Sequence, residues 1–108
     1  MSGAAMRVEL TLSASRELAA SAAWYEERTE NQGVRFAMAV DGVLASLPTA
    51  NHRRLAGFED LGVLFVAFPK RWPYRVLFVA RGDLLAVFAI AHNRRAPGYW
   101  LNRLDEVG

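Results

Sequence analysis

The chain has 108 residues, which is the length of a single domain, and its formal net charge is only +2. It contains no cysteine, which excludes disulfides and thiolate metal sites and fits a reducing compartment. No charged leader precedes a long apolar run, and the longest apolar run, residues 84–91, is far short of the ~20 residues of a membrane span. We therefore expect a cytoplasmic domain without a membrane span, and nothing in the composition indicates a metal or a cofactor.

The charge is distributed unevenly along the chain. Residues 1–60 hold six Lys/Arg and eight Asp/Glu, whereas residues 61–108 hold seven Lys/Arg and three Asp/Glu. Asp83 is the only acid between residues 61 and 104. This asymmetry favours a surface that binds phosphates or an acidic protein, although an ordinary solvated face accounts for it equally well.

The chain begins with a strand and a helix. Residues 1–5 are small and predict a disordered leader ahead of a domain spanning residues 6–104, followed by a tail at residues 105–108. Residues 7–12 alternate between apolar and polar side chains, which predicts a strand with one buried face. Ser13 is better explained as the N-cap of the next helix than as a nucleophile. That helix runs to about residue 28 and has an apolar stripe: Ala14, Leu18, Ala22 and Tyr25.

A second helix follows a short polar turn at residues 29–33. Pro48 ends this helix, and its apolar stripe has helical spacing: Phe36, Val40, Leu44 and Leu47. Two helices joined by so short a turn are expected to pack antiparallel as an αα-hairpin. Glu26 and Glu27 are adjacent on the first helix, so they point about 100° apart and are expected to face solvent rather than form an acid–base pair.

The second half of the chain predicts strands. Residues 49–61 indicate a loop, residues 62–68 indicate a strand, and the two prolines of residues 69–73 predict an exposed turn. Beyond them, apolar runs at residues 74–80 and 84–91 flank a Gly-Asp dipeptide, which is the pattern of a β-hairpin with a tight turn.

The last element is a short helix over residues 99–104, which is expected to pack Trp100 and Leu101 back on the domain. The element order β-α-α-β-β-β predicts an α+β fold in which an antiparallel sheet is covered by the αα-hairpin.

Basic residues cluster at the ends of the predicted hairpin. Three of them precede or open the first strand (Lys70, Arg71 and Arg75), and three end or follow the second strand (His92, Arg94 and Arg95). Because hairpin strands are antiparallel, the entry of the first and the exit of the second lie at the same end. The sequence therefore predicts a basic cluster at one edge of the sheet, and we take this cluster as the candidate functional site.

The motif PYRVLFVARGDLLAVFAIAHNRRAPGYW, at residues 73–100, resembles the RelE/ParE toxin superfamily, and the ParE-like (plasmid stabilisation) branch in particular. The resemblance extends upstream to WYEER at residues 24–28 and to Gly33, Arg35 and Phe36, and it covers residues 6–104. It implies the toxin of a type II toxin–antitoxin system, which inhibits growth and which the C-terminal segment of a cognate antitoxin wraps and neutralises. ParE-like toxins act on DNA gyrase, and RelE-like toxins cleave mRNA in the ribosome.

Three function classes follow. A metal-independent ribonuclease would use His92, Arg94 and Arg95 as catalytic residues and the neighbouring cations on phosphate, with Tyr99 and Trp100 stacking on bases. The structural alternatives are a hydrogen bond from His92 to the backbone and cap-and-core positions for Tyr99 and Trp100. For Arg75 the alternative to a phosphate contact is an ion pair, either within the chain or with the antitoxin. The middle strands lack the charged catalytic residues of the ribonuclease members, which favours a ParE-like gyrase inhibitor. An inactive toxin fold or nucleic-acid-binding module is the third class.

In a ParE-like toxin the basic residues and the neighbouring aromatic residues would serve the target or the antitoxin: Lys70, Arg71, Arg75, Tyr99 and Trp100. The helical hairpin also has more apolar side chains than one face of a small sheet can cover, among them Trp24, Phe36, Met38 and Val43. We therefore expect an exposed apolar groove where an antitoxin helix docks, with Trp24 and Met38 as contact residues. The alternative is that these two residues close the core.

Overall fold

The computed structural model describes residues 6–69 and 71–107, and over them it confirms the predicted α+β fold. The two helices are α1 (Leu12–Arg28) and α2 (Gln32–Ser46). The strands within these residues are β1 (Arg7–Leu10), β2 (Arg53–Arg54), β3 (Leu64–Ala67), β4 (Tyr74–Arg81) and β5 (Leu84–His92). Short 3-10 segments lie at Leu47–Thr49, Glu59–Leu61 and Leu101–Glu106, so the last one continues past the predicted end at residue 104.

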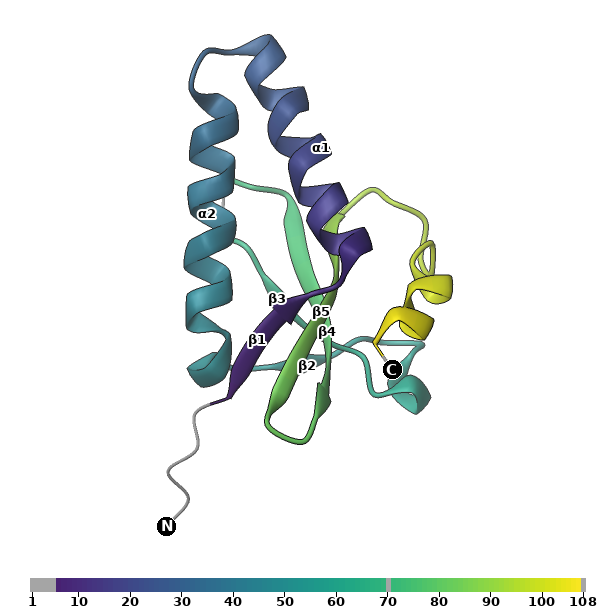
Figure 1. The fold of residues 1–108 in the computed structure, drawn as a ribbon. Helices are drawn as coiled ribbons and strands as arrows, with labels where there is room; N and C mark the ends of the chain where they lie inside the picture. Colours follow the sequence, from purple (N-terminus) through teal and green to yellow (C-terminus); the bar gives the residue numbers. More distant parts are fainter. Residues whose placement is uncertain (1–5, 70, 108) are drawn as a thin grey trace.

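The strands form one sheet with the order β1-β5-β4-β3-β2. β3, β4 and β5 pair antiparallel as predicted, and β2 pairs antiparallel to β3. The expectation of a wholly antiparallel sheet is wrong for β1, which pairs parallel to β5. The αα-hairpin carries the chain away after β1, so β1 can occupy the edge beside β5, and side-chain alternation contains no information on strand direction. Figure 1 shows α1 and α2 side by side across the sheet, with the C-terminal segment on the side away from α2.

β2 lies inside the stretch that was predicted as a loop. Its two arginines pair with residues of β3, Arg53 with Phe65 and Arg54 with Leu64. Two adjacent charged residues carry no alternating pattern, so the sequence gives no signal for this strand.

The N-cap of α1 is Thr11, so the prediction of Ser13 is wrong. Thr11 has extended backbone angles and its Oγ1 accepts a hydrogen bond from the Ala14 N–H at 3.2 Å, which is the geometry of an N-cap. Ser13 already lies within the helix. Its N–H and its hydroxyl both donate to the carboxylate of Glu106, and this contact holds the C-terminal segment against the start of α1.

Glu26 is exposed, as predicted, and it also joins the two helices, a role that the sequence did not indicate. Its carboxylate accepts from the Asn31 N–H at 2.8 Å and from the Gly33 N–H at 2.9 Å, two donors at the start of α2 that have no partner in the helix. Gly33 permits this close packing, because a Cβ there would lie 2.4 Å from the Ala22 carbonyl oxygen. Glu27 forms no such hydrogen bond within the residues that the structure describes.

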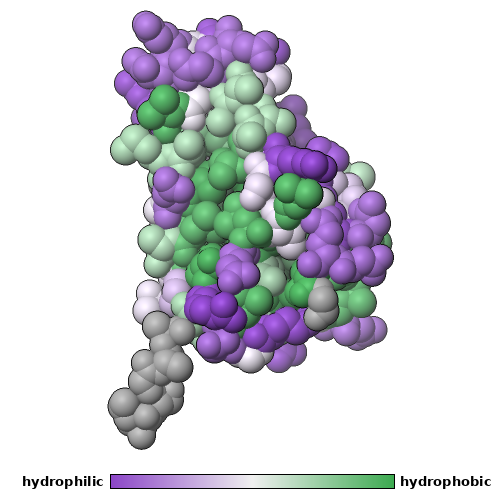
Figure 2. All heavy atoms as spheres, viewed as in Figure 1, coloured by the Kyte–Doolittle hydropathy of each residue, from purple (hydrophilic) through white to green (hydrophobic). Residues whose placement is uncertain are grey.

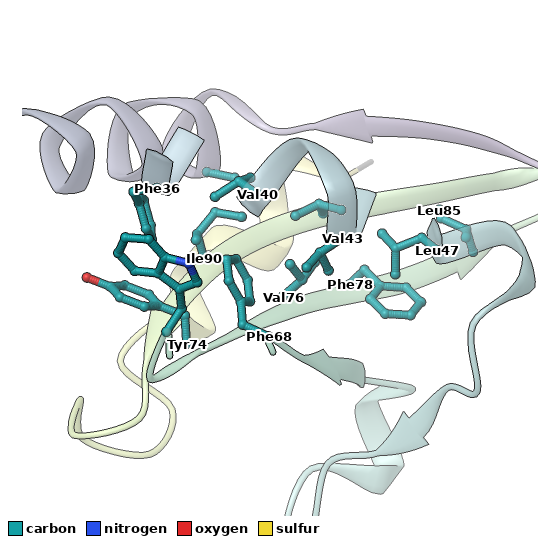
Figure 3. Close-up of a cluster of buried hydrophobic side chains, with 13 residues drawn as sticks. Phe36, Val40, Val43, Leu47, Phe68, Tyr74, Val76, Phe78, Leu85 and Ile90 are labelled. Carbon is teal, nitrogen blue, oxygen red and sulfur yellow. The ribbon is translucent and has the colours of Figure 1, made fainter. Parts of the chain in front are cut away.

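One face of the sheet, the helix-covered face, packs against α1 and α2. Its core centres on Phe36, whose ring lies 4.8 Å from Tyr74, 5.2 Å from Tyr25 and 5.3 Å from Trp72 between centroids. Figure 3 shows α2 directing its apolar stripe onto the side chains of the strands. The stripe predicted for α2 is therefore confirmed, with Val43 buried and Leu44 half-buried.

The opposite face, the loop-covered face, is covered by residues 55–63 and by the C-terminal segment. Its core contains Leu77, Val79, Phe88 and Trp100. A β-bulge shapes this face: Leu77 pairs with Ala89 but Phe78 pairs with Val87, so Phe88 is an extra residue in β5. Phe88 and Ala89 consequently both contribute to the loop-covered face.

Neither helix of the described chain has the length and apolarity needed to cross a membrane. Large apolar side chains are nevertheless exposed on the helical hairpin, where Trp24 is 51%, Val34 is 56% and Met38 is 66% exposed. Figure 2 shows apolar surface over the hairpin, below a hydrophilic tip.

Candidate functional site

A pocket of about 370 Å³ opens on the loop-covered face, at the end of the sheet where β4 begins and β5 ends. We call it the basic pocket. Its lining includes the cationic or ionisable residues Arg54, Arg75, His92 and Arg95. Its apolar and aromatic lining includes Leu55, Phe58, Phe65, Pro97, Tyr99 and Trp100. No Asp or Glu is among the described lining residues, so the charge of this pocket is positive and uncompensated from within.

Arg75 lines the basic pocket and is half-buried. Side chains alternate along β4, so Tyr74 and Val76 join the helix-covered core and Arg75 leaves on the loop-covered face. Its guanidinium carbon lies 5.3 Å from the centroid of the Phe65 ring. The Arg75 Nε is buried without a hydrogen-bond partner, and no carboxylate in the described residues forms an ion pair with it. The structural ion pair, one of the alternatives for Arg75, is thus not formed within the described residues.

His92 borders the same pocket, but its ring belongs to the other side of the sheet. It pairs across the sheet with Tyr74, and the two rings meet edge-on at 5.1 Å. Its Nδ1 accepts a hydrogen bond from the Arg94 N–H at 3.0 Å. Arg75 is the next residue after Tyr74 and leaves on the opposite face, so the imidazole and the Arg75 guanidinium do not converge. His92 therefore has the strand-end contacts that the structural alternative predicted.

Tyr99 and Trp100 form a wall of the basic pocket. Trp100 is 2% exposed, and its ring lies 4.9 Å from Phe58 and 5.1 Å from Phe88. Trp100 therefore has the core position of the structural alternative, and its ring is not free to stack on a base. The Tyr99 ring is half-buried, and the Arg95 guanidinium lies over it at 3.9 Å. Such cation–π stacking fixes the position of Arg95 at the pocket rim.

Tyr99 and Arg103 are held by Glu17 of α1, a group that we call the Glu17 clamp. Glu17 Oε1 accepts from the Ile90 N–H and from Arg103, both at 2.8 Å, and Oε2 accepts from the Tyr99 hydroxyl at 2.6 Å. Arg103 also donates to the carbonyl of Phe88 at 3.2 Å. β1 ends at Leu10, opposite Val87, so the clamp supplies partners for β5 backbone groups that β1 does not reach.

The clamp shifts the ionisation of its members. Burial and the hydrogen bond to Glu17 raise the pKa of Tyr99 well above its usual range, so its hydroxyl remains protonated. Burial by itself lowers the pKa of Arg103, but the hydrogen bond and the charge of Glu17 outweigh burial, and the pKa is raised. The Tyr99 hydroxyl is therefore a committed donor to Glu17, and it is not free to act as a general acid in the pocket.

The structure brings only part of the predicted basic cluster together. Arg75, His92 and Arg95 line the basic pocket, whereas Arg71 and Arg94 are exposed and do not line it. Lys70 lies outside the described residues. The sequence reasoning missed Arg54 and the aromatic residues Phe58 and Phe65, because they come from the stretch predicted as a loop and from a strand whose pairing was unknown.

The predicted apolar groove on the helices is present in a different form. Phe36 and Val43 are core residues, whereas Trp24 and Met38 are exposed as expected. Arg28 lies over the Trp24 ring at 3.8 Å and donates to the Trp24 carbonyl. A shallow groove of about 350 Å³ lies between α1 and α2, and small residues rather than Trp24 and Met38 line most of it: Ala22, Ala23, Glu26, Gly33, Val34 and Ala37.

The chemistry available at the basic pocket is the binding of an anion. Its arginines are permanent donors, and aromatic walls exclude water from one side. In the described part of the chain no three His, Cys, Asp or Glu side chains lie close enough together to hold a metal ion.

No protein-family model and no curated protein matches the chain. A solved structure that does match is a chain described as belonging to the chromosomal ParDE TA (toxin–antitoxin) system of P. aeruginosa. The two chains superpose with a TM-score of 0.70 over 82% of this chain and 96% of the other, at 17% sequence identity. At this identity the likeness shows the fold alone. It confirms the fold that the motifs predicted, which is that of the ParE/RelE-like proteins.

Proposed function

We propose that this chain is the toxin of a type II toxin–antitoxin pair and that a cognate antitoxin neutralises it in the cytoplasm. The observation that carries the proposal is the match in fold to a chain of a ParDE system over 82% of this chain and 96% of the other. The motif at residues 73–100 supports the same assignment independently, because it comes from sequence rather than from shape.

We infer further that the toxin acts by binding a protein target, DNA gyrase, rather than by cleaving RNA. A metal-independent ribonuclease needs a proton-transfer group and a phosphate-binding cation directed at the same atoms. His92 and Arg75 leave the sheet on opposite faces, and the Tyr99 hydroxyl is occupied by Glu17. This arrangement favours binding over cleavage.

The antitoxin is expected to dock on the helical hairpin. Trp24, Val34 and Met38 are each more than half exposed, and the groove between the helices has nearly no polar surface apart from Glu26. An amphipathic helix presents side chains at the spacing that such a groove accepts. Replacing Trp24 and Met38 together by serine is expected to weaken neutralisation without weakening toxicity.

Induced expression in bacteria tests the proposal, with growth, the DNA-damage response and the translation rate followed together. Growth arrest with DNA damage and continuing translation is the expected result. Growth without arrest, at a verified level of folded protein, contradicts the toxin assignment and leaves an inactive fold or a nucleic-acid-binding module.

The ribonuclease is the second candidate, and the cationic lining of the basic pocket is what favours it. It predicts arrest with an early fall in translation, and loss of toxicity in His92→Ala and Arg94→Ala. Our proposal predicts that both variants stay toxic, with Arg81→Ala as a matched control at the far end of β4.

A further inference from the structure

The basic pocket has a composition that the binding of a simple anion does not explain. Arg54, Arg75 and Arg95 supply positive charge, whereas apolar walls are supplied by Phe58, Phe65 and Trp100. A site for a free phosphate needs donors on several sides, and a track for single-stranded nucleic acid needs exposed aromatic faces along a basic groove. Trp100 is 2% exposed and its ring is packed between Phe58 and Phe88, so it offers no stacking face.

We propose that the basic pocket binds an acidic and apolar peptide segment of a protein partner, seating one carboxylate on Arg75 and a neighbouring apolar side chain against Phe58 and Phe65. This inference rests on the proposed function and assigns the segment to the antitoxin. The contact is separate from the contact that the antitoxin makes with the helical hairpin. The pocket volume of about 370 Å³ suits two side chains and not a folded element.

Charge complementarity carries the assignment. The Arg75 guanidinium is partly buried beside Phe65, and within the described residues it has neither a carboxylate nor a hydrogen-bond partner for Nε. A cation in such surroundings binds a carboxylate more strongly than one in open solvent, because the surrounding protein screens the charges less than water does. The planar guanidinium also favours two-point contact with a carboxylate.

The neighbouring elements are arranged to receive a chain from outside. Arg95 is held at the rim by the Tyr99 ring, which the Glu17 clamp fixes in turn. β2, which contributes Arg54 to the lining, is the edge strand of the sheet, so its outer side is open to a partner. A segment lying along this edge could place alternate side chains in the pocket.

Nuclear magnetic resonance on the full, purified chain tests the inference through the Arg75 Nε–H signal. The probes are acetyl-Leu-Glu-Leu-amide, the matched acetyl-Leu-Gln-Leu-amide and a short oligouridylate, each titrated to about 10 mM, a range suited to ligands with few contacts. We expect the acidic peptide to shift the signal saturably and the glutamine peptide to bind about tenfold more weakly, since a charge-assisted bond is lost.

Variants separate the role of Arg75 from general attraction. Arg75→Gln is expected to abolish the preference for the glutamate peptide, Arg75→Lys to retain part of it, and Arg81→Gln, at the opposite end of β4, to leave it unchanged. The backbone spectrum of each variant verifies that it is folded. Equal binding of the two peptides, no shift by either, or a larger shift by the oligouridylate overturns the inference. Because this titration involves no target and no living cell, its failure leaves the toxicity test unaffected, and the reverse also holds.

Discussion

The two faces of the sheet are built from the same strands but are covered in different ways. On the helix-covered face, α1 and α2 lie over a continuous set of apolar and aromatic side chains that includes Phe36, Tyr74 and Phe78. On the loop-covered face, residues 55–63 and the C-terminal 3-10 segment cover only part of the sheet, and the basic pocket lies in the uncovered part. The first face supplies stability, and the incomplete cover of the second leaves room for a ligand.

The faces also differ in how their covers are attached. The helices are held on the sheet by the burial of apolar side chains, which is not directional. The C-terminal segment is held by the hydrogen bonds of the Glu17 clamp and by the contact of Ser13 with Glu106. Polar attachments depend on single atoms and on pH. Variants on the two faces should therefore differ in how much they change stability and in how that change depends on pH.

The largest effect is expected from Phe36→Ala on the helix-covered face. Phe36 is fully buried among four aromatic rings, so its removal leaves a cavity and should lower the free energy of unfolding by about 3–5 kcal/mol. Urea denaturation measures the change. Val34→Ala, at an exposed position of the same helix, is the control and should stay within about 0.5 kcal/mol of the parent chain. Equal effects at the two positions would contradict the core assignment.

The second largest effect is expected from Glu17→Ala, which removes the hydrogen bonds that attach the C-terminal segment to the loop-covered face. It leaves the Ile90 N–H and the Tyr99 hydroxyl without their acceptor and leaves Arg103, whose side chain is 17% exposed, without its carboxylate. We expect the free energy of unfolding to fall by roughly 2–4 kcal/mol. Hydrogen exchange at the Ile90 N–H should be faster than exchange in the helical core. Glu27→Ala, an exposed acid on the same helix, is the matched control. Unchanged exchange at Ile90 would show that the clamp does not hold β5.

Glu26→Ala should have a smaller effect, because the groups that it satisfies are near the surface. Its carboxylate caps the start of α2 at the Asn31 and Gly33 N–H groups, and loss of such a cap costs about 0.5–2 kcal/mol. Chemical denaturation of Glu26→Ala beside Glu27→Ala measures it. If the two variants have the same stability, the capping role is wrong.

Ser13→Ala should have the smallest effect and should be visible mainly in acid. Two hydrogen bonds from Ser13 lower the pKa of the Glu106 carboxyl below its ordinary value of 4.5. A carboxyl with a lowered folded-state pKa stabilises the fold above its unfolded pKa, and this contribution is lost as the pH falls through the folded pKa. The variant should raise the pKa of Glu106 toward 4.5 and reduce the loss of stability below that pH.

Carboxyl resonances followed during a pH titration give this pKa directly. Ser15→Ala, a change at an exposed position of the same helix, should leave Glu106 unaffected. A Glu106 titration that is the same in Ser13→Ala and in the parent chain would refute the contact.

The helix-covered face could be predicted because its signal is periodic. Phe36, Val40 and Leu47 recur at helical spacing, and the hairpin of β4 and β5 was indicated by two apolar runs around Gly82, whose φ is +61°. Periodicity could not reveal the direction of β1, the two-residue β2 or the bulge at Phe88. Each of these depends on pairing between distant segments.

The basic pocket could be predicted in part for the same reason. Antiparallel pairing of the hairpin was enough to bring Arg75 and His92 to one end of the sheet. It could not show that their side chains leave on opposite faces, because this depends on the pairing register, in which His92 lies opposite Tyr74 and Arg75 lies opposite Ala91. The sequence contains no signal for the role of Glu17, since its partners Tyr99 and Arg103 are remote in sequence.

The central claim, a toxin that binds gyrase and does not cleave RNA, is tested most directly with the purified chain in a gyrase supercoiling assay. We expect inhibition that rises with toxin concentration and that the His92→Ala variant retains. Undiminished supercoiling at high molar excess of toxin, together with cleavage of mRNA on added ribosomes, would contradict it.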